Sequence, residues 1–210
     1  TRLLTLGQTD WSAMHASYRR QIEGLLDGGV DALLVETCQD PLQIRCAVHA
    51  ALHALEARGM GPEQLPIMVS VTVETTGTLL VGSEISAVAS TLRRLPVASL
   101  GLNCATGPAE MTPHVEWLAK HWDRPISVVP NAGLPILVDG RTEYPLQAAP
   151  MAERMSGFVG DLGVSMIGGC CGTTTEHIGA LRGMLEHSAP ASRSKVSFAP
   201  STSSVFGTVE

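Results

Sequence analysis

Five segments of this sequence repeat one order, a short apolar run followed by a helical pattern, and this alternation strongly constrains the fold. The apolar runs lie at residues 30–36, 65–72, 97–103, 125–130 and 164–167. The helical patterns after them lie at residues 40–58, 83–94, 110–121, 149–162 and 175–187. Another helix is predicted over residues 12–27, capped by Asp10 or Ser12. Such alternation predicts a parallel sheet whose strands are joined by helices.

Two parallel-sheet architectures fit this order, a doubly wound open sheet and part of an eight-stranded barrel. The first run, at residues 30–36, is almost continuously apolar and is predicted to be a strand buried on both faces. No Gly-x-Gly-x-x-Gly follows any of the five runs, so the sequence lacks the signature of a dinucleotide-binding open sheet. Polar and reactive residues stand instead at the C-terminal ends of the predicted strands, where barrel enzymes build their sites: Glu36, Thr72, Asn103, Cys104, Asn131, Cys170 and Cys171.

We therefore predict an α/β fold, a (β/α)8 TIM barrel that is incomplete in this chain. Five strands cannot close a ring that needs eight, and the other three would precede Thr1. Residues 1–187 are predicted to form the C-terminal part of the barrel. Residues 188–210 are rich in Ser, Ala and Pro and are predicted to be a linker toward a following domain.

Composition excludes several classes of function. The formal charge of −6, without clusters of Lys and Arg, argues against a nucleic-acid surface. No apolar run approaches the roughly 18 residues of a membrane span. Five cysteines at irregular spacing do not form the pattern of a secreted disulfide framework. We expect a cytoplasmic protein with no membrane or nucleic-acid partner.

The segment Gly168–Gly172, with sequence Gly-Gly-Cys-Cys-Gly, follows the last predicted strand. Adjacent cysteines within a strand would point to opposite faces, but glycines after the strand let the backbone turn and aim both sulfurs at one point. Thiolates are preferred ligands of Zn²⁺, so the motif suggests a metal site. A vicinal disulfide, or two packed thiols in a turn, is the alternative.

A third cysteine, Cys104, stands at the end of a strand two units before the pair. In a barrel these two strand ends face the same mouth. Three thiolates from two loops would leave one position of a tetrahedral zinc open, which marks a catalytic site rather than a structural one.

Five motifs together resemble the homocysteine S-methyltransferase family, namely Glu-Thr-Cys at 36–38, Ser-Val-Thr at 70–72, Gly-Leu-Asn-Cys at 101–104, Pro-Asn-Ala-Gly-Leu-Pro at 130–135 and Gly-Gly-Cys-Cys-Gly at 168–172. In order and spacing they look like strands four to eight of that family's zinc-containing barrel, over about residues 5–187. The likeness is closest to the homocysteine domain of the family's cobalamin-dependent members. Residues 198–205 also look like the linker that leads to a folate-binding domain in those members.

The resemblance implies a function and a set of ligands. Cys104, Cys170 and Cys171 would hold zinc, and Glu36 would bind the amino group of homocysteine. The reaction would be zinc-dependent methyl transfer to the homocysteine thiol, giving methionine. Other domains of the full-length enzyme would bind methylcobalamin and methyltetrahydrofolate. The family's first three strands also contribute to the substrate pocket, so this chain alone is expected to be inactive.

Three further strand-end residues have a functional and a plain structural interpretation. Asn131 is a candidate substrate or metal contact, although Asn is also common in turns. Thr72 is a candidate substrate contact, or a hydroxyl that satisfies the backbone. Asn103 precedes a ligand and is expected to orient its loop from behind the ligands.

Other cysteines and histidines are given structural interpretations. Cys38 is a disfavoured alternative to the three cysteines as a metal ligand. Cys46 lies inside a predicted helix and is expected to be a core residue. His49 and His53 have the i, i+4 spacing of a metal chelate, but they flank the apolar stripe of an outer helix and are interpreted as solvated.

Two other functions remain as alternatives. One is a cobalamin-independent homocysteine S-methyltransferase that takes its methyl group from betaine or S-methylmethionine. The other is a non-catalytic zinc or redox module, which would show a fourth protein ligand or a disulfide.

Overall fold

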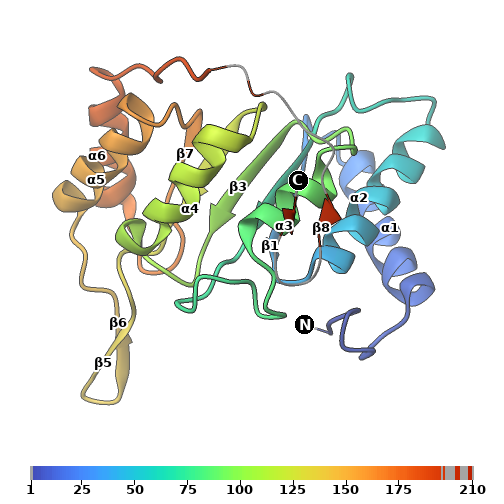
Figure 1. Ribbon diagram of the computed structural model, residues 1–210, viewed down its shortest axis with the longest axis horizontal. Helices are drawn as coiled ribbons and strands as arrows, with labels where there is room; N and C mark the ends of the chain where they lie inside the picture. The colour runs from blue at the N-terminus through green and yellow to red at the C-terminus, as the bar shows by residue number, and fades with distance from the viewer. Residues whose placement is uncertain (1, 195, 197–201, 204–207, 210) are drawn as a thin grey trace. The chain divides into compact units, whose positions relative to one another are not determined.

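The computed structural model describes residues 2–194, 196, 202–203 and 208–209, and it contains the predicted parallel sheet (Figure 1). The sheet has five strands in the order β1-β2-β3-β4-β7. Their bounds are Leu33–Cys38, Ile67–Val71, Ser99–Asn103, Ile126–Val129 and Met166–Ile167. β1 pairs in parallel with β2, and β4 pairs in parallel with β7. The sequential strand order predicted from the alternation is confirmed.

The chain divides into two compact units. Unit 1 comprises residues 1–71, 78–100 and 200–210, and unit 2 comprises residues 72–77 and 101–199. Unit 1 holds the helices α1 (Trp11–Asp27), α2 (Pro41–Glu56) and α3 (Ile85–Leu92). Unit 2 holds α4 (Pro108–His121), α5 (Ala148–Gly160) and α6 (Thr175–Leu185). All six helices match predicted ones, with ends that differ by a few residues.

Side-chain caps fix where the first two helices of unit 1 begin. The Asp10 carboxylate accepts a hydrogen bond of 2.8 Å from the backbone N–H of Ala13, as predicted for an N-cap. Asp40 caps α2 in the same way through Leu42 N–H. Its second carboxylate oxygen accepts from the backbone N–H of Thr5, so this fully buried residue also ties down the N-terminal segment.

Strand β1 corrects one expectation, because it is not buried on both faces. Leu33 and Val35 are buried, whereas Leu34 is 47% exposed and Glu36 is also exposed. β1 is an edge strand of the sheet, and within the described residues only one of its faces is covered. β3, in the middle of the same sheet, is buried along its whole length.

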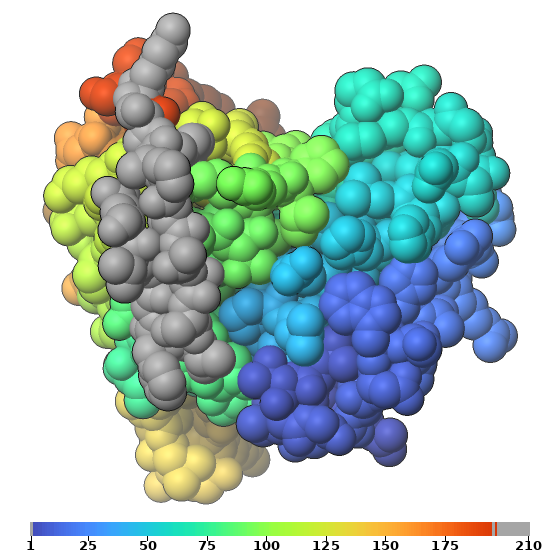
Figure 2. Space-filling model, turned by 45° about the vertical axis from the view of Figure 1, so that its right-hand side comes forward, coloured from blue at the N-terminus to red at the C-terminus, as the bar shows by residue number. Residues whose placement is uncertain are grey.

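Unit 2 contains a hairpin between the predicted strand at residues 125–130 and the predicted helix at residues 149–162, where no strand was predicted. β5 (Ile136–Val138) pairs antiparallel with β6 (Arg141–Glu143). Asp139 and Gly140 form the two-residue turn, with φ angles of 47° and 76°, which suits the left-handed positions of such turns. The apolar side chains of β5 are exposed, and Figure 2 shows the hairpin atoms in yellow protruding at the lower edge of unit 2.

The predicted linker is described only in part. Within it, the backbone N–H of Ala191 donates to Val159 O at 3.0 Å, and Arg193 donates to Trp122 O at 2.7 Å. Two short strands, β8 (Thr202–Ser203) and β9 (Thr208–Val209), pair antiparallel. Most of the linker-like segment 198–205 lies outside the described residues, and the assignment of residues 188–210 as a linker stays a prediction.

No helix among the described residues is long and apolar enough to cross a membrane.

Candidate metal and substrate site

The loop after β7 is fixed by backbone hydrogen bonds to the segment after β4. Cys170 N–H donates to Pro130 O at 2.8 Å, and Cys171 O accepts from Ala132 N–H at 2.9 Å. Within the loop, both the backbone N–H and the hydroxyl of Thr173 donate to Cys170 O. These contacts fix the backbone of both cysteines.

Cys104 reaches the same place from the end of β3 through an unusual backbone. Its N–H donates to Val129 O at 3.1 Å, and the chain then turns through Cys104 and Ala105 with φ angles of 64° and 57°. Left-handed φ values at non-glycine residues cost of order 1 kcal/mol or more, and such strain gathers at functional sites. Since neither residue is glycine, the sequence carries no signal for this turn.

The three predicted ligands converge. Cys104 Sγ lies 3.7 Å from Cys171 Sγ, and Cys170 Sγ lies 3.9 Å from Cys171 Sγ. All three sulfurs lie within 4.8 Å of one another, and among the described residues no other group of three His, Cys, Asp or Glu side chains does so. Tetrahedral zinc with Zn–S bonds of about 2.3 Å separates its sulfurs by about 3.8 Å. The donor set therefore fits zinc, and all five cysteines of the chain are free thiols.

Burial, followed by the neighbouring Cys104 and Cys171, raises the pKa of Cys170 to about 12. The thiol form is therefore strongly favoured when no cation is near. A divalent cation changes this balance, because a coordinating thiol loses its proton. A bound metal would therefore stabilise the thiolate form of Cys170.

Asn131 forms hydrogen bonds to both loops that carry the cysteines of the cluster. It is buried, and its side-chain oxygen accepts a hydrogen bond of 3.1 Å from the backbone N–H of Cys171. Its own backbone N–H donates to Thr106 O at 3.0 Å, in the loop that carries Cys104. This places Asn131 as a support for the ligand loops, while direct contact with substrate stays a prediction.

Thr72 forms a hydrogen bond with Asn103, the residue that precedes Cys104. Both are buried, and the Thr72 hydroxyl donates to the backbone carbonyl of Asn103 at 3.1 Å. This is the backbone-satisfying arrangement that was the alternative for Thr72. Asn103 lies immediately before Cys104, as expected of a residue that orients the loop, and its function stays a prediction.

Glu36 belongs to unit 1, on an irregular part of β1. It is exposed and lines a cavity of about 250 Å³ between α1 and β1. The pairing register with β2 shifts between Val35 and Cys38, and Thr37 has a φ of 58°. Such irregularities re-aim side chains and are common next to active sites. The geometry is compatible with a functional Glu36, and its contact with substrate stays a prediction.

Two residues near the cysteines were missed by sequence reasoning. The ring of Tyr144 lies against Gly172, so closely that a Cβ atom at Gly172 would collide with it. Burial and the neighbouring Cys171 raise the pKa of the Tyr144 hydroxyl. The Nδ1 atom of His177 accepts a hydrogen bond of 3.2 Å from the backbone N–H of Thr174, and its Nε2 atom lies 2.9 Å from Leu146 O.

The only signal for these residues was Asp139-Gly140, a dipeptide typical of hairpin turns. A hairpin predicted at this dipeptide would have reversed the chain direction and placed Tyr144, which follows the second strand, near the Cys loop.

The remaining cysteines do not join the cluster. Cys38 and Cys46 are buried in unit 1, as free thiols. Burial raises the pKa of Cys38 to about 12 and that of Cys46 to about 11. Both are therefore unreactive core thiols at neutral pH, as predicted for Cys46.

Comparison with known proteins finds similar sequences over most of the chain. Residues 2–185 match the sequence profile of homocysteine S-methyltransferase. The chain is 46% identical to the methionine synthase of Mycobacterium leprae over 210 residues, and 46% identical to that of Mycobacterium tuberculosis over 206 residues. Each match covers 98% of this chain but only 17% of the relative, so the chain spans about a sixth of their length.

The fold is similar to that of a solved enzyme. The apo form of the homocysteine methyltransferase MmuM from Escherichia coli matches with a TM-score of 0.63 at 25% identity, over 84% of this chain and 57% of that one. The metallated form matches with a TM-score of 0.61 at 25% identity, over 83% and 52%. With the profile match over most of its length, the chain belongs to the homocysteine S-methyltransferase family.

Proposed function

We propose that this chain is the homocysteine-binding part of a cobalamin-dependent methionine synthase, in which zinc held by three cysteines receives the substrate thiol. The observation that carries the proposal is the spacing of the three sulfurs, 3.7 Å and 3.9 Å for the two measured pairs. The mycobacterial relatives are methionine synthases, and the 17% of their length that the chain spans leaves room for other domains.

Cys104, Cys170 and Cys171 would hold the zinc ion. Homocysteine has a thiol pKa of about 8.5, and bound zinc would hold this thiol as a thiolate at neutral pH, a nucleophile ready for methyl transfer. Among the described residues no fourth metal-ligating His, Cys, Asp or Glu joins the three sulfurs within 4.8 Å. This supports a site with one position for substrate and disfavours a closed structural zinc site.

The other residues have supporting parts in this proposal. Asn131 holds the Cys171 backbone and so fixes the direction of that sulfur. Asn103 and Thr72 brace the loop that carries Cys104. We propose that Glu36 binds the substrate amino group, and that Asn131 and Thr72 also line the substrate pocket.

We also propose that the five strands are part of a (β/α)8 barrel whose remaining strands lie outside this chain. The match to only 57% of the E. coli enzyme's chain supports this. Methylcobalamin and methyltetrahydrofolate would bind to other domains of the same polypeptide. The five free cysteines suit a reducing compartment, and we propose the cytoplasm.

Calorimetric titration of the zinc-loaded polypeptide with L-homocysteine tests the proposal. Binding should release about one proton at pH 7, measured by repeating the titration in buffers of different ionisation enthalpy. The same titration of the metal-free protein should show much weaker binding. Equal binding with and without zinc would overturn the proposal.

The methyl donor is tested separately, by supplying methylcobalamin, betaine or S-methylmethionine to the complete polypeptide and measuring methionine. Methionine formed only from methylcobalamin supports cobalamin dependence. Methionine formed from betaine or S-methylmethionine by the zinc-loaded protein would favour the cobalamin-independent alternative instead.

A further inference from the structure

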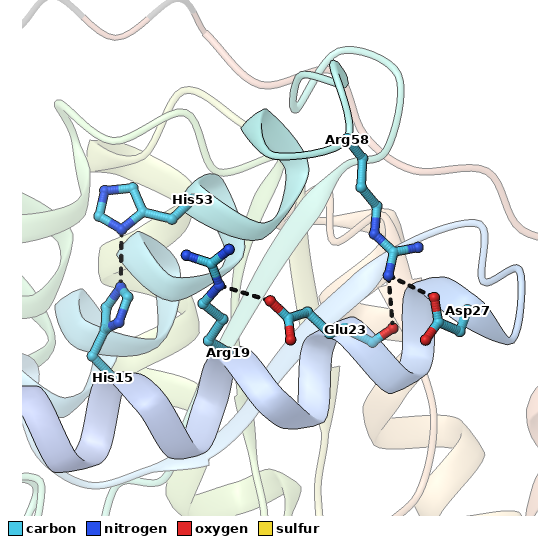
Figure 3. A network of polar contacts seen from close by, with 6 residues as sticks. All are labelled: His15, Arg19, Glu23, Asp27, His53 and Arg58. Atoms are coloured by element: carbon cyan, nitrogen blue, oxygen red, sulfur yellow. Dashed lines mark hydrogen bonds and ion pairs between the residues drawn. The ribbon is translucent and has the colours of Figure 1, made fainter.

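A second cluster of metal-ligating side chains lies on the outer helices of unit 1. His15 comes from α1, and His49 and His53 come from α2 one turn apart. The sequence shows only the α2 pair, and the fold adds the third imidazole from a different helix. Figure 3 shows the His15 and His53 rings facing each other between the two helices.

The geometry of the facing pair is close to that of a chelate. His15 Nε2 lies 3.0 Å from His53 Nδ1, and the ring centroids are 5.1 Å apart with planes tilted by 57°. Two imidazole nitrogens at this distance either share a proton or face a common cation. Tetrahedral zinc with Zn–N bonds of about 2.05 Å separates its nitrogens by about 3.3 Å. To bind a metal, the two rings would move apart by a few tenths of an ångström and rotate so that both nitrogens point at one ion.

His49 is placed to be the third ligand. Its ring centroid lies 6.2 Å from that of His53, and the two residues have the i, i+4 spacing by which one helix face presents two histidines to a metal. Among the described residues the three imidazoles do not each bring a nitrogen within 4.8 Å of the others, so His49 would join the pair only after its side chain rotates. Burial, Arg45 and the other two imidazoles lower the pKa of His49, which keeps it neutral, the form that binds metal.

The donor atoms, and not the neighbouring charges, select the kind of ion. Arg45 repels cations from His49, and Arg19, one turn after His15, is paired with Glu23 at 2.7 Å. Because the donors are imidazole nitrogens, Mg²⁺ and Ca²⁺, which need oxygen ligands, are disfavoured. Imidazole suits Zn²⁺, Cu²⁺ and Ni²⁺ instead.

We propose that His15, His49 and His53 form a second metal site, which binds a divalent transition-metal ion and links α1 to α2. The site is independent of the three cysteines in unit 2 and of the methyl-transfer proposal. Because the ion would bind residues of both helices only when they are packed together, it would stabilise unit 1.

The test is a calorimetric titration of the full chain with NiCl₂ after one equivalent of zinc has been added to occupy the thiols. A second metal should bind, and His15→Ala and His53→Ala should each lower its association constant about tenfold or more, with a smaller loss for His49→Ala. His187→Ala is the matched control, since His187 is an exposed histidine in unit 2, and should bind Ni²⁺ like the wild type. MgCl₂ should give no binding.

NMR of the histidine rings keeps the test independent of mutations. Paramagnetic Ni²⁺ should broaden the resonances of His15 and His53 before that of His187. The proposal is overturned if no second metal binds, if His15→Ala and His53→Ala bind Ni²⁺ as the wild type does, or if the His187 resonance broadens first.

Discussion

The side-chain oxygen of Asn131 accepts a hydrogen bond of 3.1 Å from the backbone N–H of Cys171. This contact adds a side-chain link to the two backbone hydrogen bonds between the loop after β4 and the loop after β7, and the same residue's backbone N–H contacts the Cys104 loop through Thr106 O. The buried Asn131 thus contacts both of the loops that carry the predicted ligands, which follow two other strands. Its removal would take away one of the two contacts that hold the Cys171 backbone, the other being the hydrogen bond from Ala132 N–H to Cys171 O.

Asn131→Ala is therefore expected to weaken zinc binding about tenfold, which is the usual size of effects from residues that orient ligands. Asn131→Asp retains an acceptor oxygen at the same position and should lose less. Competition with a chromophoric chelator measures both affinities. Wild-type affinity in Asn131→Ala would show that the contact does not position Cys171.

Replacement of any one of Cys104, Cys170 or Cys171 by Ala should abolish stoichiometric zinc binding, because two thiolates cannot supply the three-sulfur donor set. Cys38→Ala and Cys46→Ala are matched controls, since both are buried thiols outside the cluster. Metal analysis after gel filtration, with circular dichroism to confirm folding, gives the result. Zinc loss in a control that remains folded would contradict the assignment.

The order of elements and the convergence of the three cysteines could be predicted from the sequence for a physical reason. Parallel strands joined by helices put all strand C-termini at one edge of the sheet, so residues there, such as Cys104 and Cys170, are expected to meet. The observed sheet order confirms the topology. The glycines around the Cys pair correctly indicated a turn.

Features that depend on contacts distant in sequence could not be predicted. The left-handed backbone of Cys104 is imposed by its loop, because the residue itself disfavours that conformation. The meeting of His15 with His53 needs the packing of α1 on α2, which periodicity alone does not specify. The exposure of Leu34 follows from the position of β1 at the sheet edge, whereas its apolar neighbours in sequence suggested burial.

Glu36→Gln should weaken homocysteine binding by about 1.5–3 kcal/mol without changing zinc content, because a charge-assisted hydrogen bond to the substrate amino group is lost. The titration is made on the complete zinc-loaded polypeptide. Glu56→Gln serves as control, since Glu56 is also an exposed carboxylate of unit 1, at the end of α2. If Glu36→Gln binds homocysteine as tightly as Glu56→Gln does, Glu36 is not a substrate ligand.

Alkaline pH should destabilise the protein through Cys38 and Tyr18. Burial raises the pKa of Cys38 from 9.0 to about 12 and that of Tyr18 from 10.0 to about 12. Since the unfolded chain loses these protons at lower pH than the folded one, their contribution is complete below pH 9 and is lost as pH rises toward 12. Each group adds a slope of at most about 1.4 kcal/mol per pH unit.

Urea unfolding between pH 8 and pH 11 measures this effect. The free energy of unfolding should fall with pH more steeply in the wild type than in Cys38→Ala, where one of the two groups is absent. Parallel profiles for the two proteins would show that the Cys38 thiol is not protected by burial.

Gly172 and Gly140 offer a matched pair for testing the contact with Tyr144. Their φ angles are 77° and 76°, so alanine is equally strained at both positions, at a cost of roughly 1–2 kcal/mol. They differ in their surroundings: a Cβ atom at Gly172 would collide with the Tyr144 ring, whereas nothing lies within 4 Å of one at Gly140. Gly172→Ala should therefore displace the adjacent Cys171 and lower zinc affinity, whereas Gly140→Ala should keep the wild-type zinc affinity.

Chelator competition gives the affinities. Thermal unfolding should show a similar loss of stability from backbone strain in both variants, with a further loss for Gly172→Ala. Equal zinc affinity in the two variants would mean that the loop can move away from Tyr144 without disturbing the sulfur positions.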